Sequence, residues 1–163
     1  MRYSRILCGW WTKALLIAAI LLLITYATVA FTLVRGAAAQ RMTPIISAYR
    51  AAFNASGSDY DSAWGKADDL VANLSRDQSK ASDEASVALL CYYLGSHTTE
   101  DMLENVASRG LRVLPYIEKY QKRRPVLLRF DLDFMLQDSS SCHFFLGEAA
   151  KQIKHTKEQS SAH

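Results

Sequence analysis

The longest feature in the pattern of apolar and polar positions is an uninterrupted apolar run near the N-terminus. Residues 14–34 carry no charged side chain and are bounded by Lys13 and Arg35. A helix needs about 20 apolar residues to cross a bilayer, whereas the apolar core of a cleaved signal peptide has roughly 7–15. The length therefore predicts a retained transmembrane helix over residues 14–34, preceded by a cytoplasmic N-terminus over residues 1–13.

Small residues just after the run leave a second interpretation open. The segment Gly36–Gln40 reads GAAAQ, and a signal peptidase could cleave after Ala39 and release a secreted domain. The charge of Arg35 disfavours cleavage, because the region before such a site is normally uncharged. A short basic segment ahead of a first apolar span usually stays in the cytoplasm, so we expect residues after the span to be extracytoplasmic.

One face of the predicted membrane helix carries mostly small or hydroxylated residues. They recur at spacings of three and four, so they share a helix face. Small side chains let membrane helices approach closely, and hydroxyls can bond between them, so this face could support a homo-oligomer. The alternative is that each threonine bonds to its own preceding turn. The face consists of Ala14, Ala18, Leu21, Thr25, Thr28 and Thr32.

Helical periodicity dominates the rest of the chain. Pro44 follows Thr43, a pair typical of a helix start, so we expect a linker over residues 35–43 and a helical domain over residues 44–154. The clearest amphipathic stripe includes Trp64 and predicts that this side chain packs against the apolar segment 87–94. The polar tail, residues 155–163, is predicted to be disordered. The fold class is therefore all-α: one N-terminal transmembrane helix followed by a small bundle of short antiparallel helices.

Residues 126–137 are ambiguous between helix and strand. Their apolar positions alternate with polar ones, which is the period of a strand. An isolated strand would have no partner in an otherwise helical chain, so we interpret the segment as helical. The alternating apolar residues are Leu128, Phe130, Leu132, Phe134 and Leu136.

Charge is unevenly distributed along the chain, whose formal net charge is +3. Four of the basic residues flank the predicted span, so the excess of positive charge does not indicate a nucleic-acid-binding surface. Residues 59–104 are strongly acidic, and residues 105–130 are strongly basic. The two blocks could face each other. Alternatively, part of the basic block could contact anionic lipid headgroups. The residues predicted for the lipid contact are Lys119, Lys122, Arg123 and Arg124.

Two cysteines lie in the predicted extracytoplasmic domain. An exported domain with Cys91 and Cys142 favours a disulfide between them. The alternative is a buried free thiol at Cys91, because its surroundings are apolar.

Catalytic chemistry is poorly represented. No spacing of His, Cys, Asp or Glu matches a metal site, and we predict no catalytic, cofactor-binding or metal-binding residues and no cofactor. The sequence favours a single-pass, membrane-anchored interaction module that binds an unidentified protein partner, as part of an envelope or membrane complex. The alternative is a membrane-tethered enzyme that uses Asp131, Asp133 and His143, which requires residues 126–137 to form a strand.

Overall fold

The structure of the protein, a computed structural model, describes residues 13–26, 36–127 and 130–161. It divides into two compact units, Met1–Gly36 and Ala37–His163. In the first unit, residues 13–26 form a helix whose side chains are exposed. No helix within the described residues is both long and apolar enough to cross a membrane. Residues 27–34 of the predicted span, with Thr28 and Thr32, lie outside the described residues.

The described part of the second unit is built from α-helices and short 3-10 helices, which confirms the all-α prediction. The elements in chain order are α2 (Ala37–Asn54), η1 (Gly57–Asp59), α3 (Tyr60–Arg76), α4 (Lys80–Leu89), α5 (Ser96–Ser108), η2 (Gly110–Val113), α6 (Leu114–Lys122), α7 (Phe130–Asp133) and α8 (Ser139–Ser161).

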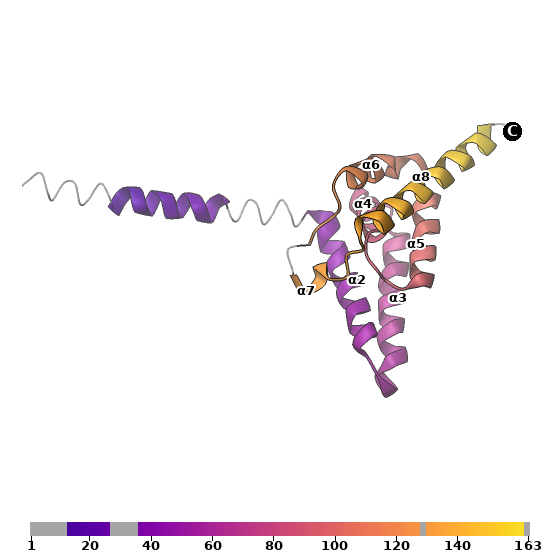
Figure 1. Ribbon diagram of the computed structural model, residues 1–163, viewed down its shortest axis with the longest axis horizontal. Helices are drawn as coiled ribbons and strands as arrows, with labels where there is room; N and C mark the ends of the chain where they lie inside the picture. The colour runs from indigo at the N-terminus through magenta and orange to yellow at the C-terminus, as the bar shows by residue number, and fades with distance from the viewer. Residues whose placement is uncertain (1–12, 27–35, 128–129, 162–163) are drawn as a thin grey trace, which may run out of the picture. The chain divides into compact units, whose positions relative to one another are not determined.

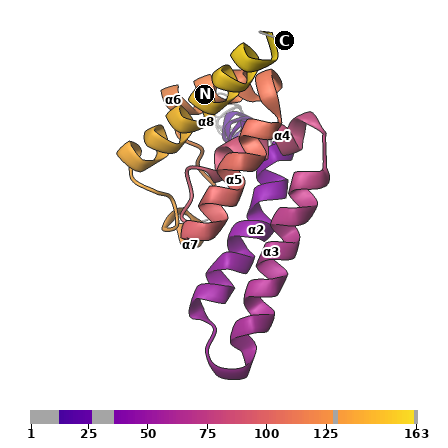
Figure 2. The same cartoon turned by 90° about the vertical axis from the view of Figure 1, so that its right-hand side faces the viewer.

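Helices α2 and α3 form a hairpin whose connection extends past the other helices of the unit (Figure 1 and Figure 2). Helix α4 is central, because it contacts α2, α3, α5 and α6. Helix α8 packs on α5 and α6, and the short α7 lies against α2. The burial pattern of α4 agrees with this position: its residues from Ala85 to Leu89 are all buried.

Helix α2 begins seven residues before the predicted start and continues through Pro44. The linker predicted over residues 35–43 is therefore helical from Ala37 onward. Ala38 and Met42 are buried in the core, and this packing outweighs the single backbone hydrogen bond that a proline removes. The Thr43 hydroxyl does not cap the helix and instead donates to the Ala39 carbonyl oxygen at 2.8 Å.

The ambiguous segment is neither a full strand nor a full helix. It contains one helical turn, α7, followed by an extended stretch in which Leu136 forms an antiparallel bridge with Tyr92. The Tyr93 N–H donates to the Met135 carbonyl oxygen, and the Gln137 N–H donates to that of Cys91, each at 2.8 Å. An extended conformation of this stretch needs a pairing partner, which the sequence did not reveal. The partner is the end of the segment 87–94, which lies beyond the last residue of α4, Leu89.

Helix α8 continues to Ser161, past the point at which the sequence predicts disorder. Its anchored part buries Leu146, Ala149 and Ile153 against the core. Once a helix is nucleated, adding further turns requires little free energy, and the following residues include good helix formers such as Lys157 and Glu158.

Candidate functional site

Four aromatic side chains gather near the connected end of the α2–α3 hairpin and form an apolar surface. Their exposed fractions are 42% for Phe53, 49% for Tyr60 and 57% for Tyr93, and Trp64 is half-buried among them. We call these four residues the aromatic surface. Exposed aromatic rings that adjoin one another are a recognised mark of interaction sites.

The rings of the aromatic surface pack directly on one another. The Phe53 and Trp64 ring centroids lie 5.0 Å apart, edge to face, and Phe53 stacks on Tyr93 at 5.7 Å. Tyr60 lies 6.0 Å from Trp64. Gly95 sits next to the cluster with a φ of +95°, and a Cβ atom there would lie 3.8 Å from the Trp64 ring. The positive φ favours glycine and turns the chain from Tyr93 into α5.

A buried polar network supports the aromatic surface from inside. The Tyr49 hydroxyl donates to Asp68 Oδ1 at 2.7 Å, and the Thr98 hydroxyl donates to the Tyr49 oxygen at 3.2 Å. Tyr49 is fully buried, and this burial raises the pKa of its hydroxyl. The network joins α2, α3 and α5, so the helices that carry the aromatic rings are held in fixed positions.

Carboxylates border the aromatic surface. Asp61, Trp64 and Asp68 lie on one stripe of α3, because they are three and four positions apart. Asp101 of α5 lies close enough to Tyr49 to help raise its pKa. Asp61 and Asp101 are both exposed, and neither forms an ion pair within the described chain.

Another exposed ring, Phe134, follows α7. Its side chain is 70% exposed, and the Arg50 guanidinium carbon lies 5.6 Å from the ring centroid. Arg50 precedes Phe53 by three residues, so both side chains lie on the same side of α2. Phe134 therefore lies near the side of α2 that carries Phe53.

Sequence reasoning placed Trp64 and Tyr93 in the core. Trp64 is partly buried and packs against the core, whereas Tyr93 is exposed. Leu89 and Leu90 are buried as the sequence predicts, but Tyr93 lies after α4, where the chain has become extended. The signal that could have revealed this is Gly95: a glycine two residues after Tyr93 marks a change of backbone direction.

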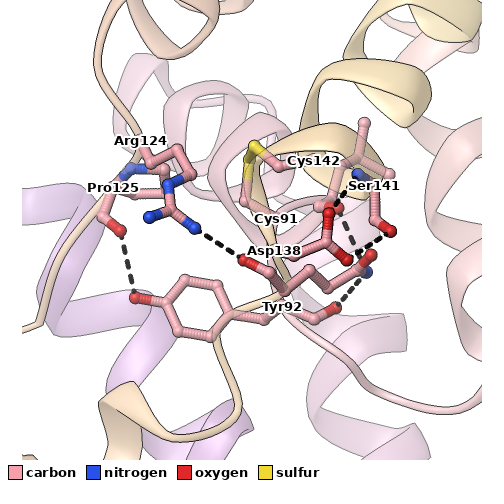
Figure 3. Close-up of a disulfide and its surroundings, with 9 residues drawn as sticks. Cys91, Tyr92, Arg124, Pro125, Asp138, Ser141 and Cys142 are labelled. Atoms are coloured by element: carbon pink, nitrogen blue, oxygen red, sulfur yellow. Dashed lines mark hydrogen bonds between the residues drawn. A yellow bond between two sulfur atoms is a disulfide. The ribbon is translucent and has the colours of Figure 1, made fainter.

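Cys91 and Cys142 form a disulfide, with their Cα atoms 4.4 Å apart. Figure 3 shows that the bond links Cys91, in the segment that follows α4, to Cys142 in the first turn of α8. Around it, the Arg124 guanidinium donates to the Gln137 carbonyl oxygen at 2.8 Å, and the Tyr92 hydroxyl donates to that of Pro125 at 3.5 Å. Both sulfurs belong to fully buried residues.

The acidic and basic blocks meet inside the second unit. Arg109 Nη1 lies 2.5 Å from Asp83 Oδ1, Arg112 lies 3.0 Å from the same oxygen, and Lys119 lies 2.5 Å from Glu84. This pairing agrees with the interpretation that the blocks face each other.

Of the residues predicted to contact lipid headgroups, two already form bonds within the second unit and two do not. Lys119 is occupied by Glu84, and Arg124 donates to the Gln137 carbonyl oxygen. Lys122 and Arg123 remain exposed, with no ion pair inside the described chain. A lipid contact there would therefore depend on two residues.

The predicted membrane-helix face is described only in part. Ala14, Ala18, Leu21 and Thr25 belong to the helix of residues 13–26. The Thr25 hydroxyl donates to the Leu21 carbonyl oxygen, which matches the alternative in which a threonine bonds to its own preceding turn.

Two of the three residues of the alternative enzyme have described side chains. Asp133 Oδ1 accepts a hydrogen bond from the Leu127 N–H at 3.1 Å, so this carboxylate ties the end of α7 to the segment before it. His143 lies exposed on α8, and the side chain of Asp131 is outside what the structure describes. Within the described residues, no group of three or more His, Cys, Asp or Glu could hold a metal ion.

An open groove of about 770 Å³ lies beside the far end of α8. The side chains of Ser108, Gln152, His155 and Thr156 that line it are exposed, so none is held in a fixed direction toward a ligand. The groove is thus a weaker candidate than the aromatic surface.

No family model, curated protein or solved structure matches the chain.

Proposed function

We propose that the protein is a single-pass membrane anchor whose helical unit, Ala37–His163, binds another protein through the aromatic surface. The apolar run of residues 14–34 supports the anchor, because it has the length of a bilayer span and no charged residue. The basic residues before the run support a cytoplasmic N-terminus.

The disulfide supports an extracytoplasmic helical unit. Structural disulfides persist in oxidising compartments and are rare in the cytosol of mesophiles. The proposed orientation places Cys91 and Cys142 in such a compartment.

The observation that carries the proposal is the aromatic surface. Soluble proteins expose single apolar residues without functional meaning, but Phe53, Tyr60, Trp64 and Tyr93 are connected by contacts between their rings. Tryptophan and tyrosine are enriched among the residues that dominate the binding energy of protein interfaces. The supporting network around Tyr49 holds the rings in place before binding, which reduces the entropy lost on association.

A photo-crosslinking experiment tests the proposal. The crosslinking amino acid p-benzoylphenylalanine would replace Tyr93 in one variant of the full chain and Phe134 in another, in intact cells. Glu118 on α6 provides a matched exposed control position. We expect one discrete crosslinked species from Tyr93 and Phe134 and none from Glu118. Crosslinks to no protein from either aromatic position would contradict the proposal.

A further inference from the structure

We infer that the segment docking on the aromatic surface is cationic: a stretch of a partner protein that presents arginine or lysine beside an apolar side chain. The inference rests on the proposed function and specifies the chemistry of its partner. It follows from the aromatic surface together with the exposed carboxylates of α3 and α5.

The charge of this region is the first argument. Residues 59–104 contain ten acidic and three basic residues. Some of the acids are paired inside the unit, as Asp83 is with Arg109. Asp61 follows Tyr60 on α3, and Asp101 lies near Tyr49, whose ring centroid is 5.8 Å from that of Trp64. Both carboxylates are exposed and form no ion pair within the described chain. A neighbouring cation would lower the repulsion among these carboxylates, whereas an acidic partner would increase it.

The arrangement of the rings is the second argument. Asp61 and Asp68 lie one turn before and after Trp64 on the same stripe of α3. A guanidinium or ammonium group can therefore rest near the face of an aromatic ring and near a carboxylate at once, combining a cation–π contact with an ion pair. The same unit already contains such a contact, between Arg50 and Phe134. The exposed faces of Phe53 and Tyr93 remain for an apolar side chain.

The position of the surface is the third argument. The basic residues of α6 and η2 pair with acids near the start of α4, so they do not neutralise the carboxylates beside Trp64.

Selection from a library of random peptides tests the inference while the natural partner is still unidentified. The full chain would be inserted into phosphatidylcholine nanodiscs and used to select phage that display such peptides, after removal of phage that bind empty nanodiscs. We expect selected peptides to be enriched in arginine or lysine next to aliphatic or aromatic residues. Selected peptides without an excess of positive charge, or no selection above empty nanodiscs, would overturn the inference.

Matched variants then locate the binding. Neutralising the bordering acids with Asp61→Asn and Asp101→Asn should weaken the selected peptides by about tenfold. The control pair Asp69→Asn and Glu118→Gln makes the same change of charge at exposed positions elsewhere and should change affinity little. Equal weakening by both pairs would show a non-specific effect of net charge and would overturn the assignment to this surface.

The outcomes also separate this inference from the proposed function. If Tyr93 crosslinks a protein in cells but selected peptides are not cationic, the interaction module stands and the partner chemistry is wrong. If the crosslinked protein is a second copy of this chain, and Trp64→Ala converts oligomers into monomers, the occupant is the chain itself and the inference fails. If neither crosslinks nor peptides are obtained, both proposals fail.

Discussion

At the scale of single residues, Arg109 has the largest structural role of any ion in the described chain. Its side chain is almost fully buried, and its guanidinium bonds to Asp83 at 2.5 Å, to the Asn105 side chain at 3.0 Å and to the Leu74 carbonyl oxygen at 2.8 Å. It therefore fixes the end of α3 to α4 and α5. A cation at the C-terminal end of a helix is also favoured by the helix dipole.

Replacing Arg109 with methionine should lower the free energy of unfolding by about 3–5 kcal/mol, because the Asp83 carboxylate would stay buried without its main partner. The control Arg112→Met, at a more exposed site that contacts the same carboxylate, should cost about 0–1 kcal/mol. Trp64 can report unfolding in urea once Trp10 and Trp11 are changed to phenylalanine, since these are the three tryptophans of the chain. Similar losses for both variants would contradict the assigned role of Arg109.

Asp77 should make the stability of the helical unit sensitive to acid. Hydrogen bonds from the Ser82 side chain and the Ser79 backbone N–H lower the pKa of Asp77 to about 2. Because the folded state holds the carboxylate ionised, the stabilisation is complete above the ordinary pKa of about 4 and is lost as the pH falls toward 2. Asp77→Asn should therefore flatten the dependence of the melting temperature on pH between about 5 and 2. The exposed control Asp69→Asn should keep the dependence of the unaltered chain, and an equally steep profile for Asp77→Asn would refute the account.

At the scale of elements, the fold depends on how the chain leaves α4. After Leu89 the chain makes a tight turn through Leu90 and Cys91, which carries Cys91 to its disulfide with Cys142. The chain then pairs with residues 135–137. Asp138 then starts α8, because its carboxylate accepts a hydrogen bond from the Ser141 N–H at 2.9 Å and from two serine hydroxyls. These bonds lower the pKa of Asp138. The connection between α4 and α8 is thus covalent, hydrogen-bonded and capped within one short stretch.

Removing the disulfide with Cys91→Ala and Cys142→Ala should destabilise the unit by about 4 kcal/mol, the loop entropy expected for the 51-residue separation of the two cysteines. Urea unfolding followed by Trp64 fluorescence measures the loss. Cys8→Ala provides the control and should leave the midpoint unchanged. Alkylation of both Cys91 and Cys142 in denatured, unreduced protein would show that the bond is not formed.

At the scale of the whole molecule, the chain combines a short first unit with a helical unit that has its own core. That core joins residues from α2 to α8, with Tyr49, Tyr92 and Leu146 among its largest fully buried side chains. Under the proposed function, membrane attachment and partner binding belong to different units.

Protein extracted from membranes should retain the residues that precede Ala39, and mass analysis of the intact chain checks this. A reporter fused after His163 should be active only outside the cytoplasm, because the basic residues ahead of the apolar run favour that orientation. A protein that starts at Gln40 would instead be secreted. Reporter activity in the cytoplasm would show the opposite orientation. The disulfide would then no longer support an extracytoplasmic helical unit.

The sequence by itself determined the features that depend on local periodicity. The stripe of α3 is the clearest case: Ala67, Val71 and Leu74 are spaced for one helix face and are buried in the structure. A segment that is apolar nearly all round is typical of a helix at the centre of a domain, and α4, which carries residues 87–89, does lie there. Such patterns can be interpreted locally, because a helix fixes which residues share a face before any other element is considered.

Tertiary structure alone decided the features that depend on distant partners. Pro44 lies inside α2 because Ala38 and Met42 reach the core, and Leu136 is extended because Tyr92 supplies the other side of its bridge. Tyr93 is exposed for a related reason: the chain must leave α4 to form that bridge. The aromatic surface arises where separate segments meet, so its rings became neighbours only when α2, α3 and the segment after α4 packed together. Such contacts are not evident from the sequence, because residues far apart in the chain that meet only through packing share no local periodicity.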